Sequence, residues 1–286
     1  MERRLYQYRI GGLCFRLDGP EFPDDPTLDK FFAGESDLSV DYSLHTADAV
    51  VDRICGELLY EDRYSRIFRC DADRIVRVFR DAHTGESYLT DEKIGDVHTA
   101  FLSSAYKRHI VPRLVYHLLD IPGTLIEHGG ILLHASYIDA GGKAILFTGP
   151  KQMGKSTQAD LWKTYRGAKI VNGDRALLRR KNGIWYAWGS PFCGTSRICE
   201  NRELPLAAIV ILSQKKDGSQ CEKASVRRAL TAMLDGCTFD TWNTEQVRMV
   251  SDLCGDIIAS VPFLTLDCLP DESAVIALEQ QLSRIP

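Results

Sequence analysis

Hydrophobic and polar residues alternate along much of the first part of the chain, which predicts β-strands there. Residues 38–45 alternate strictly, as expected for a strand with one buried face. Two further apolar runs, residues 67–68 and 75–79, flank the polar sequence Asp71-Ala72-Asp73. Two strand-like runs joined by a short turn-forming sequence predict a β-hairpin.

The pattern changes further along the chain. Over residues 97–119 the spacing of the apolar positions favours a helix, and Pro122-Gly123 is expected to break it. We therefore predict a smaller β-rich region with a trailing helix over residues 1–119. A second domain is expected over residues 120–286.

The second domain is predicted to alternate strands with helices, which indicates an α/β fold. The turn at Gly141-Gly142 separates its first two strands, and Lys181-Asn182-Gly183 predicts a hairpin. The expected strands are residues 131–138, 143–148, 169–171, 206–212 and 262–266, and the expected helices are residues 155–165, 225–234, 244–260 and 272–282.

Composition narrows the class of protein. The chain has 286 residues and a net charge of −4, which argues against non-specific nucleic-acid binding. It contains no apolar run long enough to cross a bilayer, and its first residues lack the apolar core of a signal peptide. Nine scattered cysteines without C-x-x-C spacing favour reduced thiols. We expect a cytoplasmic protein with no membrane or nucleic-acid partner.

Residues 149–156 read GPKQMGKS and match the pattern G-x-x-x-x-G-K-[ST] at every fixed position. An apolar run precedes them and a helical pattern follows, which is the context of a phosphate-binding P-loop (Walker A). Glycines let successive backbone N–H groups turn around a phosphate, and the helix N-terminus adds further donors. We predict a site for ATP or GTP formed by Gly149, Lys151, Gln152, Met153, Gly154, Lys155, Ser156 and Thr157.

The chemistry of such a site also requires a divalent metal, here Mg²⁺. Lys155 is expected to reach the β- and γ-phosphates, and the Ser156 hydroxyl is expected to bind the metal. The carboxylate ligand usually follows a nearby strand, and Asp174 follows the predicted strand 169–171. We expect that strand to lie beside the strand that leads into the P-loop. The alternative is that Asp174 only forms a turn.

The order of these features resembles HPr kinase/phosphorylase and the wider group with the phosphoenolpyruvate-carboxykinase-type nucleotide fold. The resemblance covers residues 134–175 and begins with His134 on a strand. The P-loop follows, then a helix that ends at Arg166-Gly167, and then Asp174-Arg175. Residues 1–120 carry no part of it.

The resemblance implies an ATP- and Mg²⁺-dependent phosphotransferase, a kinase that acts on a serine hydroxyl of a protein, a peptide or a small molecule. Carried over by position, Gly154, Lys155 and Ser156 hold the phosphates and the metal. Asp174 takes a metal-binding role, and His134 lies near the reacting phosphate. Family members often assemble into homo-oligomers.

One position departs from the family pattern. Gly173 stands where the family has a first aspartate that accepts the proton of the attacking hydroxyl. Asp174 then does both jobs, or His134 acts as the base, or the protein binds nucleotide without useful catalysis as a regulatory or accessory protein. The family's C-terminal signature for the reverse reaction is absent, so no phosphorylase activity is expected. A carboxykinase-like reaction would need a second metal site that the sequence does not provide.

Two arginines are candidates for substrate contacts. Arg175 adjoins Asp174 and is expected to bind a phosphate oxygen or that carboxylate. Arg197 ends a loop, residues 190–197, that is rich in small and hydroxyl residues. This loop is either an acceptor-binding or closing loop, or an ordinary connection between strands. The sequence leaves open the acceptor, the choice between ATP and GTP, and the oligomeric state.

Overall fold

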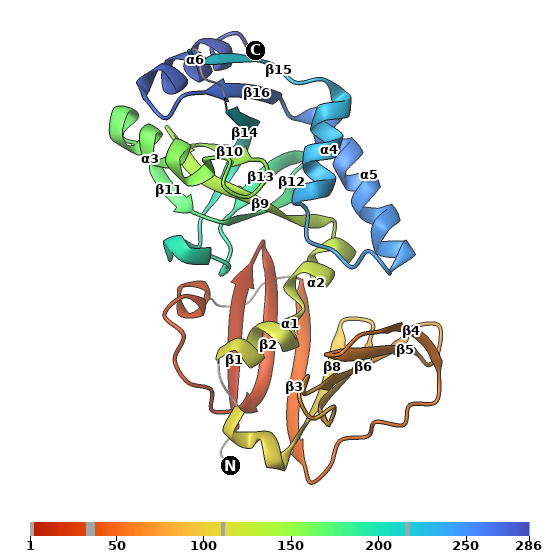
Figure 1. The fold of residues 1–286 in the computed structure, drawn as a ribbon. Coiled ribbons are helices and arrows are strands. Elements are labelled where there is room, and N and C mark those ends of the chain that lie inside the picture. Colours follow the sequence, from red (N-terminus) through yellow and green to blue (C-terminus); the bar gives the residue numbers. More distant parts are fainter. Residues whose placement is uncertain (1–2, 33–37, 110–111, 215–217, 286) are drawn as a thin grey trace. The chain divides into compact units, whose positions relative to one another are not determined.

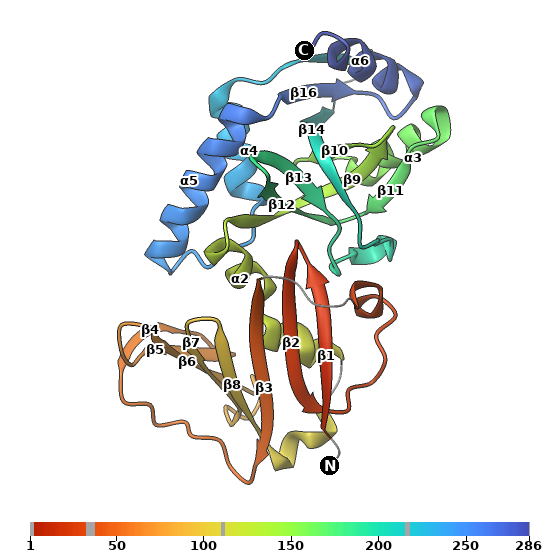
Figure 2. The same cartoon turned by 180° about the vertical axis from the view of Figure 1, so that it is seen from behind.

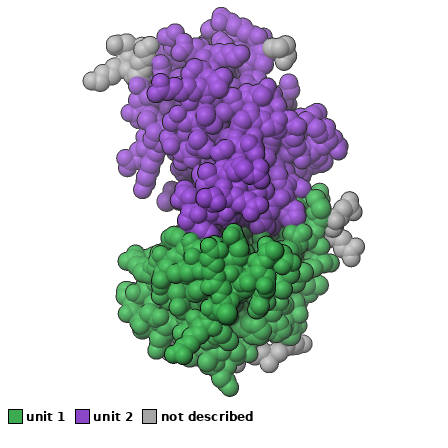
Figure 3. All heavy atoms as spheres, turned by 90° about the vertical axis from the view of Figure 1, so that its right-hand side faces the viewer, with its two compact units in different colours: residues 1–121 green, residues 122–286 purple. Residues whose placement is uncertain are grey.

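The computed structural model of the chain describes residues 3–32, 38–109, 112–214 and 218–285. The chain forms two compact units, Met1–Ile121 (unit 1) and Pro122–Pro286 (unit 2), which Figure 3 colours separately. Each unit is built on its own large sheet, and helices accompany both (Figure 1). The fold is therefore mixed α/β, as expected at this level.

Unit 1 is an eight-stranded sheet in the order β1-β2-β3-β8-β7-β6-β5-β4. Its strands are mainly antiparallel, but β3 pairs in parallel with both β2 and β8. The predicted hairpin is confirmed as β5 and β6. The elements are β1 (Arg3–Ile10), β2 (Leu13–Pro20), η1 (Leu28–Phe31), β3 (Ser39–Ala47), β4 (Glu57–Glu61), β5 (Ser65–Arg69), β6 (Arg74–Arg80), β7 (Ser87–Ile94), β8 (Val97–Ser103), η2 (Ser104–His109) and α1 (Pro112–Leu119).

The helix predicted over residues 97–119 is wrong for its first part. Val97–Ser103 is strand β8, which lies between β3 and β7. His98, Ala100 and Leu102 are buried, which is the period of two that a strand requires. The short apolar run of residues 97–103 fits both the period of a strand and that of a helix. Pairing with β3 and β7 decides for the strand. Ile110, which contributed to the helical pattern, lies outside the described residues.

The helical break also differs from the expectation. It falls at Asp120, which has a φ of +39° and separates α1 from α2 (Ile121–Glu127). Pro122 and Gly123 lie in the first turn of α2, where a proline loses no intrahelical hydrogen bond.

Unit 2 confirms the predicted order of strands and helices. Its sheet runs β10-β9-β12-β13-β14-β16-β15, with β10 also paired to β14 and β11 paired to β9. The elements are β9 (Gly130–Ala140), β10 (Lys143–Thr148), α3 (Lys155–Arg166), β11 (Lys169–Asn172), β12 (Arg175–Lys181), β13 (Ile184–Trp188), η3 (Gly194–Ser196), β14 (Glu203–Gln214), β15 (Gln220–Lys223), α4 (Val226–Gly236), α5 (Thr244–Ser260), β16 (Phe263–Cys268) and α6 (Glu272–Leu282).

Helices cover both faces of this sheet (Figures 1 and 2). One apolar cluster joins the sheet to α4 and α5 through residues such as Met233 and Ile257. A second cluster joins the other face to α3 and α6 through Trp162 and Leu278. Strands buried on both faces read as continuous apolar runs, which explains why β10 and β14 are apolar almost throughout. No helix within the described ranges is long and apolar enough to cross a membrane.

The expected neighbour of β10, the strand that leads into residues 149–156, is wrong. β10 lies between β9, to which it is antiparallel, and β14, to which it is parallel. β11, which leads to Asp174, pairs with β9 instead. The cause is the length of β9: its 11 residues pair with β10 along one edge and with β11 and β12 along the other.

Candidate functional site

The middle of β9 brings the predicted site residues together. Ala135 pairs with Thr148, the last residue of β10, on one edge. The preceding residue, His134, pairs with Arg175, the first residue of β12, on the other edge. Because neighbouring strands lie about 5 Å apart, the segment after β10 and the turn before β12 are separated by roughly 10 Å. The middle of β9, the end of β10 and the start of β12 thus lie side by side at His134.

Residues 149–156, the motif segment, form a tight loop between β10 and α3. Gly149 and Gly154 have φ values of +146° and +98°, conformations that favour glycine. Gln152 also has a positive φ, +66°, which is uncommon for a residue with a side chain. The Met153 amide donates a 3.3 Å hydrogen bond to the carbonyl of Pro150 and closes the turn.

The N-terminus of α3 differs from those of the later helices in unit 2. Ser225, Asn243 and Asp271 cap α4, α5 and α6 with side-chain oxygens. The N-cap of α3 is Gly154, which offers no side chain to cap the first-turn N–H groups. Those donors, with the positive end of the helix dipole, suit an anion. Ser156 and Thr157 are exposed in this first turn.

Lys155 is the buried cation of the motif segment. Its side chain points back into the loop, where Nζ donates to the carbonyls of Gly149 at 2.9 Å and Pro150 at 3.0 Å. The residue is only 8% exposed. Burial lowers the pKa of Lys155, and the negative charge of Asp174 partly opposes that change. A buried ammonium that is held by carbonyl groups gains from an anionic ligand. Lys151 and Gln152, by contrast, are exposed.

His134, Asp174 and Arg175 form a loose charged group. His134 Nδ1 lies 3.0 Å from the carbonyl oxygen of Asp174 and 3.5 Å from its Oδ1. Asp174 Oδ2 lies 3.6 Å from Arg175 Nε. Burial and then the positive charge of Lys155 lower the pKa of His134, while Asp174 opposes them. A neutral ring that donates from Nδ1 to the carbonyl keeps Nε2 as an acceptor.

Asn172, which the sequence did not single out, positions Asp174. It is fully buried, and its Oδ1 accepts hydrogen bonds of 2.8 Å from the backbone N–H groups of Asp174 and Arg175. Its Nδ2 donates to the carbonyl of Ser190 at 2.8 Å. An asparagine whose side-chain oxygen accepts from the amide two residues further on makes an Asx-turn. The sequence contains a signal for this turn, because Asn172-Gly173-Asp174 directly follows the predicted strand 169–171.

Gly173 is enclosed by the loop before β14. Its amide donates to the carbonyl of Ile198 at 3.2 Å, and its carbonyl accepts from Ser136 Oγ at 3.1 Å. A Cβ at this position would lie 2.1 Å from Ser196 Oγ. Ser196 therefore fills the space that a side chain at position 173 would need. The sequence marked this loop but not Ser196.

The same loop also adjoins Asp174. Gly194 has a φ of +54°, and a Cβ there would lie 2.8 Å from Asp174 Cγ. Arg197, with a φ of +55°, is exposed.

Arg175 is held by Thr238, in the segment that follows α4. Its Nη1 donates to Thr238 Oγ1, and the Thr238 amide donates to the carbonyl of Leu132 on β9 at 2.9 Å. The two candidate arginines thus differ, because Arg175 lies within the charged group and Arg197 lies on an exposed loop.

One carboxylate and one hydroxyl near the motif segment could bind Mg²⁺ together with phosphates and waters. Within the described residues, no group of three or more His, Cys, Asp and Glu side chains is arranged to hold a metal ion. Mg²⁺ usually binds one or two protein oxygens, with phosphates and waters as its other ligands. The carboxylate of Asp174 and the hydroxyl of Ser156 fit that pattern.

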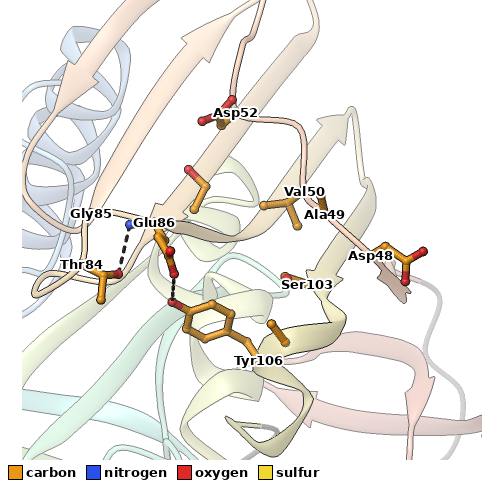
Figure 4. A pocket seen from close by; sticks show the side chains of 11 residues that line it. Asp48, Ala49, Val50, Asp52, Thr84, Gly85, Glu86, Ser103 and Tyr106 are labelled. Atoms are coloured by element: carbon orange, nitrogen blue, oxygen red, sulfur yellow. Dashed lines mark hydrogen bonds between the residues drawn. The ribbon is translucent and has the colours of Figure 1, made fainter.

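A pocket in unit 1 has a different chemistry (Figure 4). Its volume is about 470 Å³, and the described residues that line it include carboxylates of Asp48, Asp52 and Glu86 but no lysine or arginine. The Tyr106 hydroxyl points at Glu86 and donates to its Oε2 at 3.1 Å. An acidic lining repels phosphate, so this pocket does not compete with the motif segment as a nucleotide site.

Comparisons with known proteins add little to this geometry. No family model matches the chain, and no curated protein matches it. Among solved structures, the Hpr(Ser) kinase/phosphatase from Coxiella burnetii matches 53% of this chain and 88% of its own length, with 12% identity and a TM-score of 0.31. This likeness is distant, and the assignment of function has to come from the site itself.

Proposed function

We propose that this protein is an ATP- and Mg²⁺-dependent phosphotransferase that acts on a serine hydroxyl, with unit 2 as a P-loop nucleotide-binding unit of the HPr-kinase type. The observation that carries the proposal is the position of Lys155. Its buried ammonium donates to two loop carbonyls at the start of α3, a helix without a side-chain cap. A nucleotide phosphate would replace those carbonyls as a stronger, charged acceptor.

The residues around Lys155 supply the other parts of a phosphoryl-transfer site. The motif segment and the first turn of α3 bind phosphate oxygens through backbone N–H groups. The Ser156 hydroxyl and the Asp174 carboxylate hold Mg²⁺. ATP supplies the phosphoryl group, and Mg²⁺ supplies neutralising charge. GTP fits the same backbone donors, because they do not contact the base.

Two residues are placed to orient the acceptor hydroxyl. Asp174 adjoins the position where the family has its proton acceptor, and His134 has an acceptor nitrogen if its Nδ1 donates to Asp174. The lowered pKa of His134 favours the neutral ring that such a role needs. A loose transition state requires little help from a base, so positioning and charge neutralisation carry most of the catalysis. Arg175 and Arg197 are the candidates for binding the acceptor or a phosphate oxygen.

The acceptor is a protein, a peptide or a small molecule with a serine hydroxyl. We place the reaction in the cytoplasm, where ATP is available and where the nine free cysteines stay reduced. Assembly into a homo-oligomer is part of the same proposal.

A second function is favoured by one observation. Gly173 lacks the carboxylate, and Ser196 fills the space where it would lie. A protein that binds nucleotide without useful turnover, as a regulatory or accessory protein, fits that arrangement. The two functions differ in whether ADP forms faster with an acceptor than without one.

The experiment is label transfer from γ-labelled Mg-ATP in a lysate of the source cells, followed by identification of the labelled residues. We expect a labelled serine product with the wild type and with Lys163→Ala, an exposed lysine on the same helix. Lys155→Ala should give none. Equal labelling by Lys155→Ala would contradict the kinase proposal, and tight ATP binding without any product would favour the second function.

A further inference from the structure

The loop of residues 193–198, which we name the serine loop, holds a hydroxyl against the strand end that carries Asp174. Ser196 Oγ donates to the carbonyl of Cys193 at 2.7 Å and accepts from the Ile198 amide at 3.2 Å. Residues 194–197 are exposed. Ser196 therefore combines an accessible hydroxyl with a defined position.

The serine loop is fixed to the end of β11 by backbone pairing. Gly173 donates to the carbonyl of Ile198, and Asn172 forms an isolated antiparallel bridge with Cys199. The Glu200 amide donates to the carbonyl of Val171 at 2.9 Å. These contacts keep Ser196 beside Gly173, and Gly194 of the same loop lies against Asp174.

Two glycines allow this close approach. At Gly173 a Cβ would lie 2.1 Å from Ser196 Oγ and 2.7 Å from Ser196 Cβ. At Gly194 a Cβ would lie 2.9 Å from Asp174 Cβ. Real Cβ atoms do not come this close to other atoms, so the loop would have to move if either glycine carried a side chain. The absence of side chains at both positions makes room for a serine hydroxyl at the site.

Asp174 connects this hydroxyl with the phosphate-binding residues. Its charge acts on the pKa of Lys155, and its carboxylate lies 3.5 Å from His134 Nδ1. Ser196 packs against Gly173, one residue before the carboxylate whose charge acts on the buried lysine of the motif segment. In a serine phosphotransferase, an acceptor hydroxyl has to lie at this place.

We propose that Ser196 is a phosphate acceptor of the protein itself, so that the chain transfers a phosphoryl group from bound ATP to its own serine loop. The inference rests on the proposed function, because it uses the same phosphate-binding residues and the same Asp174. It goes beyond that function in naming a modification site within this chain. The serine loop occupies the acceptor position until an external substrate displaces it.

Ser196 Oγ forms a bond to the γ-phosphorus while the bond from that phosphorus to the β–γ bridging oxygen breaks. The products are phosphoserine at position 196, ADP and one proton. That proton passes from Ser196 Oγ to the carboxylate of Asp174 and then to water. Ser196 gives up its hydrogen bond to the Cys193 carbonyl, and the remaining contacts of the loop through residues 198–200 stay in place.

The test uses the full-length purified protein, Mg-ATP and no added acceptor. Intact-mass measurement counts the phosphoryl groups gained, and peptide fragmentation locates them. Ser196→Ala removes the acceptor, and Thr195→Ala is the matched control, since Thr195 is the exposed neighbouring hydroxyl. Calorimetric titration with Mg-ATP is performed on each variant, so that binding is measured apart from transfer.

We expect one phosphoryl group on Ser196 in the wild type and in Thr195→Ala, and none in Ser196→Ala, with unchanged Mg-ATP affinity in all three. The rate should not depend on protein concentration, because the transfer is intramolecular. Gly173→Ala, which displaces Ser196, should slow it about tenfold or more.

Normal Mg-ATP binding with no phosphate on Ser196, or with the phosphate elsewhere, overturns this inference and leaves the proposed function standing. A rate that rises with protein concentration also overturns it, because transfer would then take place between molecules. An absence of Mg-ATP binding overturns the inference together with the proposed function.

Discussion

Each unit contains a cluster of one arginine, one aspartate and one histidine. The closed cluster, in unit 1, consists of Arg77, Asp91 and His98. The open cluster, in unit 2, consists of Arg175, Asp174 and His134. In unit 1 the three side chains are 13%, 0% and 2% exposed, and Arg77 lies 2.7 Å from the carboxylates of both Asp91 and Asp120. In unit 2 the corresponding side chains are 30–32% exposed, and the contacts of Asp174 are 3.5 Å and 3.6 Å long.

The balance of charge differs as well. In unit 1 one arginine faces two carboxylates, and its Nη2 also donates to the carbonyl of Leu118. Burial alone would raise the pKa of Asp91, but Arg77 and the hydrogen bond from His98 outweigh it and lower that pKa. In unit 2 the single carboxylate of Asp174 lies 3.6 Å from Arg175 Nε, and its charge also acts on the pKa of Lys155. Removing one member of a closed, compensated cluster leaves a buried charge unpaired, whereas a half-open cluster with excess positive charge suits an anionic ligand.

The largest expected effect comes from breaking the closed cluster. Arg77→Ala leaves Asp91 buried without its main partner, and we expect a loss of about 3–5 kcal/mol in the free energy of unfolding of unit 1. Arg74→Ala is the control, because Arg74 pairs with Glu92 at 2.7 Å on the surface, with 41% and 34% of the two side chains exposed. It should cost much less than Arg77→Ala, because an ion pair on the surface is screened by solvent and contributes little to stability. Equal losses in urea unfolding would contradict the comparison.

The next largest effect is expected at Gly173, the residue before Asp174 of the open cluster. Gly173→Ala places a Cβ against Ser196, and we expect a destabilisation of about 1–3 kcal/mol in thermal unfolding. Ser196→Gly removes the obstacle, so the double variant should recover most of that loss. A double variant as unstable as Gly173→Ala alone would show that Ser196 is not the residue that fills this space.

Asp174→Asn tests the metal-binding role of the open cluster. We expect the protein–nucleotide complex to bind Mg²⁺ at least about tenfold more weakly. Loss of a residue that only supports a metal ligand already lowers metal affinity by about tenfold or more, and loss of a direct ligand should lower it at least as much. Asp160→Asn, on the exposed side of α3, is the control and should leave the Mg²⁺ titration unchanged. An unaltered titration for Asp174→Asn would assign the metal to another ligand.

The smallest expected effect is a change in how the stability of unit 1 depends on pH in acid. The pKa of Asp91 is lower in the folded protein than in the unfolded chain, so its contribution is fully present above about pH 4. That contribution is lost as the pH falls through the lowered pKa. The charged groups that face Asp91 are Arg77 and His98, and Arg77 also pairs with Asp120. Asp91→Asn should make the unfolding free energy of unit 1 less dependent on pH below about pH 4, as measured by urea titrations at several pH values.

Local features of the site could be predicted from the sequence. The strand, the motif segment and the start of α3 at Lys155 are contiguous, and the glycines at 149 and 154 have the positive φ values that such a loop requires. Most strands and helices of unit 2 followed from periodicity, because long amphipathic or apolar runs have one dominant period.

Features that depend on pairing between distant segments could not be predicted. The pattern of residues 97–103 predicts a helix, but these residues form a strand, because their conformation is decided by pairing with the neighbouring strands. The pairing of β11 with β9 follows from the length of β9, which only the assembled sheet reveals. The position of Ser196 at Gly173 depends on the backbone pairing of residues 198–200 with the end of β11.

Calorimetric titration of the full chain with Mg-ATP tests the central claim most directly, that the open cluster of unit 2 is a nucleotide site. The account predicts saturable binding to the wild type and to Lys163→Ala. Lys155→Ala should bind roughly 10–100-fold more weakly, which corresponds to the loss of a charge-assisted contact of about 1.5–3 kcal/mol. Lack of binding to the wild type, or equal affinity for Lys155→Ala, would contradict it.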